Sequence, residues 1–390
     1  MKRIIISIGF SAFVFFCTAC YGTKVNPIPG ANQIDQYKHL IENKSIAIVA
    51  NQTSVVGKTH LVDTLLSLGI KVNLIFAPEH GFRDLADAGE RIEDGKDTRT
   101  GVRISSLYGG HLKPTPDDLK GINLVIFDIQ DVGVRFYTYI STLHYVLEAC
   151  AENNVECIIL DRPDPNGFYF DGNITDTVYR SFVGMDPVPV VHGMTVGEYA
   201  GMLNGEGWLK NGVKCRLTVI KCKNYTHKTL YELPVRPSPN LPNQTSIYLY
   251  PSICFFEGTN ISLGRGTSFP FQVYGSPKLS DKGFSFTPES IPGAKNPPLL
   301  GEKCYGVDLR NAIKDKIVPS RQLNLEWVID AYRNYPYKDN FFTPYFDVLA
   351  SGPALREQIQ QGLSAEEIRA TWKEGLERFG KIRGKYLLYK

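Results

Sequence analysis

Acidic side chains follow three apolar segments in the first half of the chain, each at the point where the segment ends. They are Glu79 beside His80 after residues 72–77, Asp128 and Asp131 after 124–127, and Asp161 after 157–160. If these segments are parallel strands of one sheet, their carboxyl ends meet at one edge, where ligands bind in open α/β folds. One acidic residue after a strand is often a solvated turn, but three at one edge predict a site for acid–base chemistry.

The segments that position these residues alternate between strand-like and helix-like patterns. Runs that are apolar at consecutive positions predict buried strands, and apolar residues at helical spacing predict helices. The predicted strands are 45–50, 72–77, 124–127 and 157–160, and the predicted helices are 59–68, 139–153 and one that follows a capping box at Thr195 and Glu198. This alternation predicts an α/β fold over residues 41–212, with a Rossmann-like parallel sheet covered on both faces.

The second half of the chain has a different composition. Prolines cluster over residues 234–242, and residues 248–275 are dense in aromatic residues, Gly and Pro, which indicates loops and short strands. Helical patterns return over residues 325–333 and, after a capping box at Ser364 and Glu367, over 368–379. A chain of 390 residues is long enough for two domains, so we predict a second, smaller α+β domain over residues 213–390.

Several cofactor and partner classes can be tested by their motifs and by charge. The chain has no GxGxxG after its first predicted strand, no GxxxxGK[ST] and no GxSxG, so nothing predicts a nucleotide cofactor or a serine nucleophile. The formal net charge of +3 becomes +1 if Lys2 and Arg3 are removed with a leader, and a near-neutral chain lacks the basic footprint of a nucleic-acid binder. We expect no cofactor and no nucleic-acid partner.

A metal site is the sharper alternative for the charged strand ends. His80, Asp128, Asp161 and His192 have the side chains that ligate metals, but nothing in their spacing requires one, and after the predicted leader neither CxxC nor HxxxH occurs. We therefore predict a site without metal.

The N-terminus is typical of an export signal. Lys2 and Arg3 precede an apolar stretch, residues 4–16, that is too short to span a bilayer comfortably. Small residues before Cys20 resemble a loose bacterial lipobox, which predicts lipidation of Cys20, and the alternative is ordinary cleavage near Ala19. We expect residues 1–20 to form the signal peptide and lipobox and residues 21–40 to form a tether. The mature protein is then periplasmic and meets the membrane only through the lipid.

Export changes how the remaining cysteines are interpreted, because disulfides form in an oxidising compartment. These six are Cys150, Cys157, Cys215, Cys222, Cys254 and Cys304. Cys215 and Cys222 bracket an apparent strand whose ends would lie about 20 Å apart, so they cannot bond each other if the strand is real. We interpret the six as structural or incidental.

Eight strings distributed along the chain resemble one enzyme family. They are Asn51-Gln-Thr-Ser54, Phe76-Ala-Pro-Glu-His-Gly-Phe-Arg83, Asp87-Ala-Gly-Glu90, Phe127-Asp-Ile-Gln-Asp-Val-Gly-Val-Arg-Phe-Tyr-Thr-Tyr139, Leu160-Asp-Arg-Pro-Asp-Pro-Asn-Gly167, His192-Gly-Met-Thr195, Pro237-Ser-Pro-Asn240 and Phe256-Glu-Gly-Thr259. In this order they resemble the NamZ-type exo-β-N-acetylmuramidases, from about residue 45 to the C-terminus. The resemblance implies a Rossmann-like domain beside a smaller C-terminal domain, with the active site between them. The implied activity is release of terminal N-acetylmuramic acid from the non-reducing end of peptidoglycan fragments, in cell-wall turnover.

Glycosidase chemistry assigns roles to the acidic residues. Cleavage of a β-glycosidic bond commonly needs one protonated carboxyl to donate to the leaving oxygen and a second group that activates water, attacks, or is replaced by the substrate's acetamido group. We predict that Glu79 is the acid, because the apolar strand and Pro78 before it desolvate its carboxyl, and that His80 orients it or the sugar. Asp128 and Asp131 rank above Glu257 and Glu90 for the second group, without a choice among them.

Muramic acid carries a lactyl carboxylate, for which the planar fork of an arginine is a suitable partner. Arg83, Arg135 and Arg265 are the candidates, and internal salt bridges to Asp84, Asp128 or Glu257 are the alternative for each. Other residues expected to bind substrate are Tyr137, Asp161, His192 and Asn240, with Tyr139 and Phe256 either stacking on sugar or filling the core. We expect Glu79, Asp128 and Glu257 to line one cavity between the domains. A metal-dependent hydrolase and a catalytically silent lipoprotein that binds wall fragments remain the competing classes.

Overall fold

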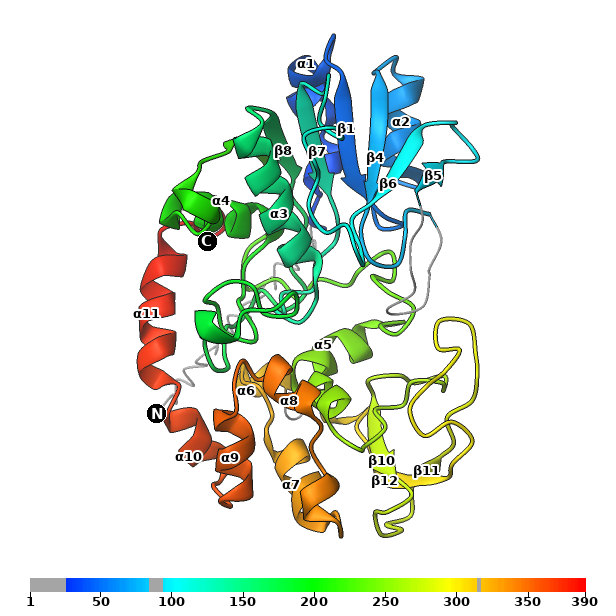
Figure 1. The fold of residues 1–390 in the computed structure, drawn as a ribbon, viewed down its shortest axis with the longest axis vertical. Helices are drawn as coiled ribbons and strands as arrows, with labels where there is room; N and C mark the ends of the chain where they lie inside the picture. Colours follow the sequence, from blue (N-terminus) through cyan, green and yellow to red (C-terminus); the bar gives the residue numbers. More distant parts are fainter. Residues whose placement is uncertain (1–25, 84–93, 314–316) are drawn as a thin grey trace, which may run out of the picture.

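The computed structural model describes residues 26–83, 94–313 and 317–390 (Figure 1). Its N-terminal part is built on a seven-stranded sheet with the order β5-β6-β4-β1-β7-β8-β9, in which each pair is parallel except β5 with β6. The strands are β1 (Ile46–Ala50), β4 (Val72–Ala77), β5 (Gly95–Lys96), β6 (Arg103–Ser106), β7 (Leu124–Asp128), β8 (Glu156–Leu160) and β9 (Arg216–Ile220). The predicted Rossmann-like parallel sheet is confirmed.

Helices cover both faces of this sheet. Alternate residues of the central strands belong to two different hydrophobic clusters: Ile46 and Ile48 of β1 pack with α1 (Ile34–Ile41) and α2 (Leu61–Ser67), whereas Ala47 and Val49 pack with α3 (Tyr139–Glu152) and α4 (Val196–Glu206). Burial on both faces explains why these strands are apolar at every position. The capping box that begins α4 is present, with reciprocal bonds between Thr195 and Glu198.

The first predicted helix is two residues shorter at its start than the sequence pattern indicated. Thr59–His60 form β3, which pairs with β2 (Val55–Val56), and the His60 side chain then accepts a hydrogen bond from the backbone of Val62 as the N-cap of α2. A histidine is not among the usual capping residues, so no capping signal marks this boundary in the sequence.

The C-terminal part combines helices with a small antiparallel sheet of order β10-β12-β11. Its strands are β10 (Val273–Ser276), β11 (Ser285–Phe286) and β12 (Cys304–Asp308), and its helices are α5 (Gln244–Ile253), α6 (Val318–Ser320), α7 (Glu326–Asn334), α8 (Pro344–Leu349), α9 (Ala354–Gln360), α10 (Ala365–Ala370) and α11 (Lys373–Gly384). The predicted capping box at Ser364 is present. The helix expected over 368–379 is instead two helices, α10 and α11, which meet at Thr371 and Trp372.

Residues 26–40 and β9 belong to the N-terminal part of the molecule, contrary to the predicted boundaries. Residues 26–40 are packed and do not form a tether: Ile28 pairs with Lys223, and the buried Tyr37 hydroxyl donates to the Ala31 carbonyl at 2.9 Å. β9 lies beyond residue 212 but pairs with β8, so the sheet extends past the predicted boundary. The predicted signal peptide and Cys20 lie outside the described residues.

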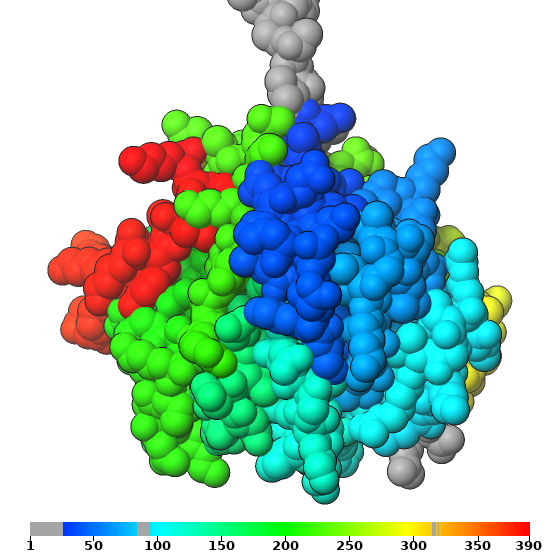
Figure 2. All heavy atoms as spheres, turned by 90° about the horizontal axis from the view of Figure 1, so that it is seen from above, coloured from blue at the N-terminus to red at the C-terminus, as the bar shows by residue number. Residues whose placement is uncertain are grey.

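The C-terminal tail also crosses back. Tyr386 packs against Gly205 of α4, where an added Cβ would lie 2.3 Å from the tyrosine oxygen, and the Tyr389 hydroxyl donates to Asp161 at 2.5 Å. Figure 2 shows this red segment lying against the green segment that includes α4. The last residues therefore tie the two parts of the molecule together.

The cysteines and the helices of the structure bear on the predictions that follow from export. The six cysteines from Cys150 to Cys304 are buried and carry free thiols, and the predicted strand between Cys215 and Cys222 is β9. Among the described residues, no helix combines the length and the apolar composition needed to cross a lipid bilayer.

Candidate active site

A cavity of about 290 Å³ lies between the two parts of the molecule and is walled by both. From the N-terminal part come the ends of β4 and β6 and the turn before α3, and from the C-terminal part come α5, the loop after it and the start of α8. The polar and charged residues of its wall are Glu79, His80, Tyr108, Tyr137, Thr138, Ser238, Asn240, Tyr250, Glu257, Arg265 and Tyr345. A cavity therefore lies where the active site was predicted, between the two parts of the molecule.

Glu79 lies at the carboxyl end of β4 with its side chain held by two hydroxyl groups. The Thr138 hydroxyl donates to Glu79 Oε2 at 2.8 Å, and the Tyr108 hydroxyl also hydrogen-bonds to this carboxylate. Burial, and then the charge of Glu79, raise the pKa of Tyr108, so this hydroxyl keeps its proton. Because hydroxyl groups both donate and accept, the pair can hold Glu79 in either protonation state, as a proton-transferring carboxyl requires.

His80, next in the chain, is mostly buried in the cavity wall and has a left-handed backbone, with φ of 70°. Such a conformation is costly for a residue other than Gly and is found most often at functional sites. It turns the chain sharply at the end of β4, so that Glu79 and His80 both reach the cavity.

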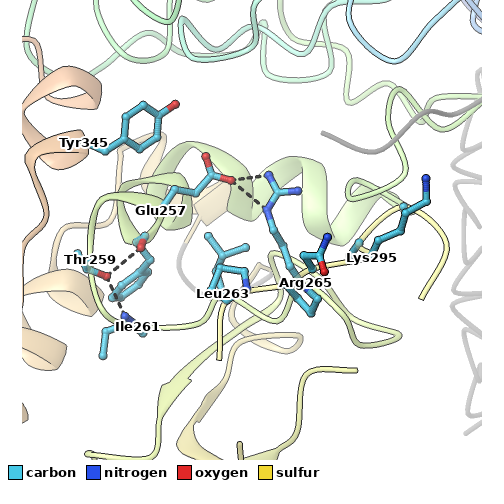
Figure 3. Close-up of a pocket in the computed structure, with 13 residues that line it drawn as sticks. Glu257, Thr259, Ile261, Leu263, Arg265, Lys295 and Tyr345 are labelled. Carbon is cyan, nitrogen blue, oxygen red and sulfur yellow. Dashed lines mark hydrogen bonds and ion pairs between the residues drawn. The ribbon is translucent and has the colours of Figure 1, made fainter. Parts of the chain in front are cut away.

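Glu257 faces the cavity from the C-terminal part, in a 3-10 turn over Cys254–Gly258. Arg265 donates to its Oε1 from Nε at 3.1 Å and from Nη2 at 2.5 Å, as Figure 3 shows. Both side chains are about one-fifth exposed, so the pair is reachable from the cavity. Two carboxylates, Glu79 and Glu257, therefore approach one space from opposite sides.

The two aspartates ranked highest for the second catalytic group do not line this cavity. Asp128 is fully buried and accepts two hydrogen bonds from Arg162, at 2.6 and 2.9 Å. Asp131 is also buried, and its Oδ2 accepts the backbone N–H of Gly133 at 2.7 Å. A strand-end carboxylate was expected to face the ligand, but these two are turned into the protein, where Asp128 pairs with an arginine and Asp131 accepts a backbone amide.

Two of the three arginines proposed for the lactyl group are likewise engaged elsewhere. Arg83 forms paired hydrogen bonds to Asp63 and Asp97, at 2.6 to 3.0 Å. Arg135 is 1% exposed and donates to the carbonyls of Asn173 at 2.6 Å and Leu349 at 2.9 Å. Leu349 belongs to α8, so Arg135 joins the two parts of the molecule. Of the three, only Arg265 lines the cavity.

Replacing Arg135 with Ala is expected to lower the free energy of unfolding by about 3 kcal/mol, because it removes a large buried side chain and leaves buried carbonyls without donors. Chemical denaturation measures this change, and the exposed Arg333→Ala is the control, expected to stay within about 0.5 kcal/mol of wild type. A loss below about 1 kcal/mol for Arg135→Ala would show that the contact does not stabilise the fold.

The side chains offered as metal ligands do not gather in one place. His80 lines the cavity, Asp128 pairs with Arg162, and His192 is fully buried with its ring against Tyr199. In the described ranges, no three His, Cys, Asp or Glu side chains are grouped so that they could hold a metal ion.

Comparison with known proteins matches both parts of the chain to one family. Residues 46–245 match the family profile described as exo-beta-N-acetylmuramidase NamZ, N-terminal, and residues 248–389 match its C-terminal counterpart. The chain belongs to the NamZ family. The two matched regions meet between residues 245 and 248, after β9 and at the start of α5.

Similar proteins span nearly the whole length of this NamZ family member. A curated relative from Bacillus subtilis (strain 168), named peptidoglycan beta-N-acetylmuramidase NamZ, is 38% identical over 375 residues, which cover 91% of this chain and 89% of the relative. Crystal structures of two DUF1343 family proteins from Bacteroides fragilis are also similar. One is 50% identical with a TM-score of 0.87 and the other 28% identical with a TM-score of 0.79. The matches cover 94% of this chain in both cases, and 99% and 100% of those chains.

Two of the other predicted substrate-binding residues, Tyr137 and Asn240, line the cavity between the two parts of the molecule. The Tyr137 hydroxyl donates to the Pro237 carbonyl at 2.8 Å, and the Asn240 amide donates to the Gly293 carbonyl at 2.9 Å. Phe256 lines an adjoining cavity and stacks on Tyr274. Glu90 and Asp84 lie outside the described residues.

Asp161 is a buried structural residue and does not line the cavity. Its carboxylate accepts hydrogen bonds from Thr195 Oγ1 at 2.8 Å, from Gly197 N at 2.8 Å and from the Tyr389 hydroxyl. It therefore anchors α4 and the C-terminal tail to the end of β8. Burial, despite these donors, raises the pKa of Asp161 from 3.8 to about 6.

This pKa predicts a specific pH dependence of stability. Between about pH 4 and pH 6 the folded chain keeps a proton that the unfolded chain releases, so stability falls as pH rises through this window. Relative to Asp161→Asn, wild type is expected to lose about 2 kcal/mol of unfolding free energy over the window. Urea denaturation at both pH values measures it, with the exposed Asp35→Asn as a control that keeps the wild-type dependence. An Asp161→Asn variant that kept the wild-type pH dependence would contradict the raised pKa of Asp161.

Sequence reasoning missed five polar residues of the cavity wall: Tyr108, Thr138, Ser238, Tyr250 and Tyr345. Thr138 lies inside the motif from Phe127 to Tyr139, and Ser238 lies inside the motif from Pro237 to Asn240. Tyr108 follows β6, whose mixed composition did not predict a strand, and Tyr345 is the second residue of a six-residue helix that carries no motif. Only Thr138 and Ser238 had a signal in the sequence, namely their place in a motif.

Proposed function

We propose that the chain is an exo-acting glycoside hydrolase that releases terminal N-acetylmuramic acid from the non-reducing end of peptidoglycan fragments. The observation that carries this proposal is the small cavity into which Glu79 and Glu257 project from the two parts of the molecule. Its volume of about 290 Å³ suits one sugar residue better than a polymer, as exo cleavage requires. The family match and the activity in the name of the Bacillus subtilis relative support the same substrate class.

In this proposal Glu79 is the general acid. A protonated carboxyl donates to the glycosidic oxygen as the bond to the sugar breaks, and proton donation at that moment stabilises the leaving group. Thr138 and Tyr108 fix the orientation of the Glu79 carboxyl, so that the proton is presented in one direction.

Glu257 replaces Asp128 and Asp131 as the proposed second group, because it is the other carboxylate that lines the cavity among the described residues. Its two hydrogen bonds from Arg265 hold its carboxylate in place at the cavity wall. From there it can assist the attack of water or steer the substrate's acetamido group. His80, Tyr137 and Asn240 complete the wall that holds the sugar in place.

We further propose that the enzyme is exported and lipid-anchored at Cys20, so that it meets wall fragments in the periplasm. Support comes from the charged start, the short apolar stretch and the small residues before Cys20. In bacteria expressing the chain, labelled fatty acid should enter wild type and not Cys20→Ser, which should move from the membrane to the soluble fraction. If wild type and Cys20→Ser fractionate identically and neither takes up the labelled fatty acid, the proposed anchor is contradicted.

Turnover of a chromogenic β-N-acetylmuramoside by the purified chain tests the proposed activity, with and without a chelator. We expect colour release at the same rate in both arms. Binding without turnover would instead support the silent wall-binding protein, and loss with chelator that zinc restores would support the metal-dependent hydrolase.

A further inference from the structure

A second cavity, of about 560 Å³, opens beside the catalytic one and shares three wall residues with it: Glu257, Arg265 and Tyr345. Its other walls are the segment from Phe256 to Leu263 and a proline-rich loop over residues 293–298 (Figure 3). Glu79 lines only the smaller cavity. The junction between the cavities therefore lies beside Glu257, one of the two proposed catalytic carboxylates, where a scissile bond would be held.

The loop that closes this second cavity is docked firmly onto the catalytic side. The Asn240 amide donates to the Gly293 carbonyl, and a Cβ on Gly293 would lie 2.6 Å from Pro239 Cβ. Just before this loop, Glu289 N donates to the Gly266 carbonyl. Within the loop, Pro297 lies so close to Gly266 that a Cβ on Gly266 would be 2.6 Å from it. Gly266 and Gly293 have φ of 80° and 88°, so these close approaches need glycine. The cavity is thus preformed, as ligand sites usually are.

Tyr345 is the exposed aromatic residue at the junction. It lies at the start of α8 and is 40% exposed, although it borders both cavities. Burial of its hydroxyl, and then the charge of Glu257, raise the pKa of Tyr345, with Glu79 also contributing. The ring therefore borders both cavities, as Glu257 does, and part of it is open to a ligand.

We propose that the second cavity is the subsite for the leaving sugar, a neutral N-acetylated amino sugar on the reducing side of the scissile bond, and that Tyr345 is its stacking platform. This rests on the proposed function. The smaller cavity, which holds Glu79, takes the terminal muramic acid, and the larger one admits the sugar that departs. Its exposed wall suits an amino sugar: Pro298 and the Tyr345 ring offer apolar surface to C–H groups, and Lys295 and Asn296 offer polar groups to hydroxyls. Arg265 and Glu257 pair with each other at the junction.

The test compares two substrates that share the terminal sugar and differ in the leaving group. One is the disaccharide of N-acetylmuramic acid β-linked to N-acetylglucosamine, and the other is methyl β-N-acetylmuramoside, whose leaving group does not reach the second cavity. The readout is the ratio of kcat/KM for the disaccharide to kcat/KM for the methyl glycoside. We expect Tyr345→Ala to lower this ratio about tenfold, and the bulky Asn296→Trp to lower it at least as much.

Matched variants control for effects on the fold and on the hydroxyl. Tyr345→Phe keeps the ring and should keep the ratio, and Tyr337→Ala, which removes a ring that is 56% exposed and lines neither cavity, should leave it within twofold. As a second readout, inhibition of chromogenic muramoside hydrolysis by free N-acetylglucosamine should weaken about tenfold in Tyr345→Ala.

The outcomes separate this inference from the proposed function. If wild type cleaves both substrates and the ratio is unchanged in Tyr345→Ala and Asn296→Trp, the subsite is wrong and the activity stands. Equal losses on both substrates, with no change in inhibition by N-acetylglucosamine, would overturn the subsite too. If wild type cleaves neither substrate, the proposed function fails, and the subsite fails with it.

Discussion

Replacing Glu79 with Gln is expected to reduce the release of N-acetylmuramic acid by ~10²-fold or more while the fold persists. The amide keeps the shape of the side chain and can still accept the hydrogen bond from Thr138, but it has no proton to transfer to the leaving oxygen. The change is read as kcat on a chromogenic muramoside, with circular dichroism and denaturation used to confirm that the variant is folded.

The control for this variant is Glu366→Gln, the same chemical change at an exposed position of α10. It should retain wild-type turnover. Near wild-type turnover in Glu79→Gln would show that Glu79 only shapes the end of β4, and the catalytic assignment would then have to move to another group of the cavity. Loss of the fold would be visible in the denaturation curve.

A preference for muramosides over glucosaminides is the second large expected effect. Leaving a buried, unpaired arginine without the lactyl carboxylate would cost several kcal/mol, but Arg265 is already paired with Glu257, which reduces the penalty. The remaining contribution is that of a charge-assisted hydrogen bond, about 2–3 kcal/mol, so we expect wild type to prefer the muramoside by roughly 10²-fold.

Arg265→Ala should remove most of this preference. In the described structure its Nε and Nη2 are directed to Glu257, and Nη1 remains to meet the lactyl group. The ratio of kcat/KM on the two sugars is the readout, because loss of the Glu257 partner lowers both rates. Arg265→Lys keeps the charge without the planar fork and should retain part of the preference. Equal losses on both sugars in Arg265→Ala would mean that this arginine orders Glu257 and does not read the lactyl group.

The core of the fold could be predicted because burial leaves a direct mark on sequence. β1, β4, β7 and β8 are buried on both faces, and each was visible as an apolar run. The edge strand β9 alternates between exposed and half-buried positions up to Ile220, so its place in the first sheet was not predictable from hydrophobicity. Residues 26–40 and the last tyrosines join this sheet through contacts between distant parts of the chain, which no local pattern records.

The candidate site was predictable to the level of its segments and not of its side chains. The ends of β4 and β7 were expected at one edge, and they are there, but a sequence does not show which way a carboxylate turns. Glu79 faces the cavity, whereas Asp128 pairs with Arg162, a residue 34 positions later. Arg135 is a further example, because its partners are carbonyl groups at Asn173 and Leu349, and carbonyls are present at every residue.

The most direct test of the central claim is the identity of the product from a defined peptidoglycan oligosaccharide that carries N-acetylmuramic acid at its non-reducing end. After incubation with the purified chain, mass spectrometry should find free N-acetylmuramic acid and an oligosaccharide shortened by one sugar, with no internal fragments at early times. A matched oligosaccharide that begins with N-acetylglucosamine should remain intact. Release of N-acetylglucosamine, early internal cleavage, or an unchanged substrate would each contradict an exo-acting muramidase.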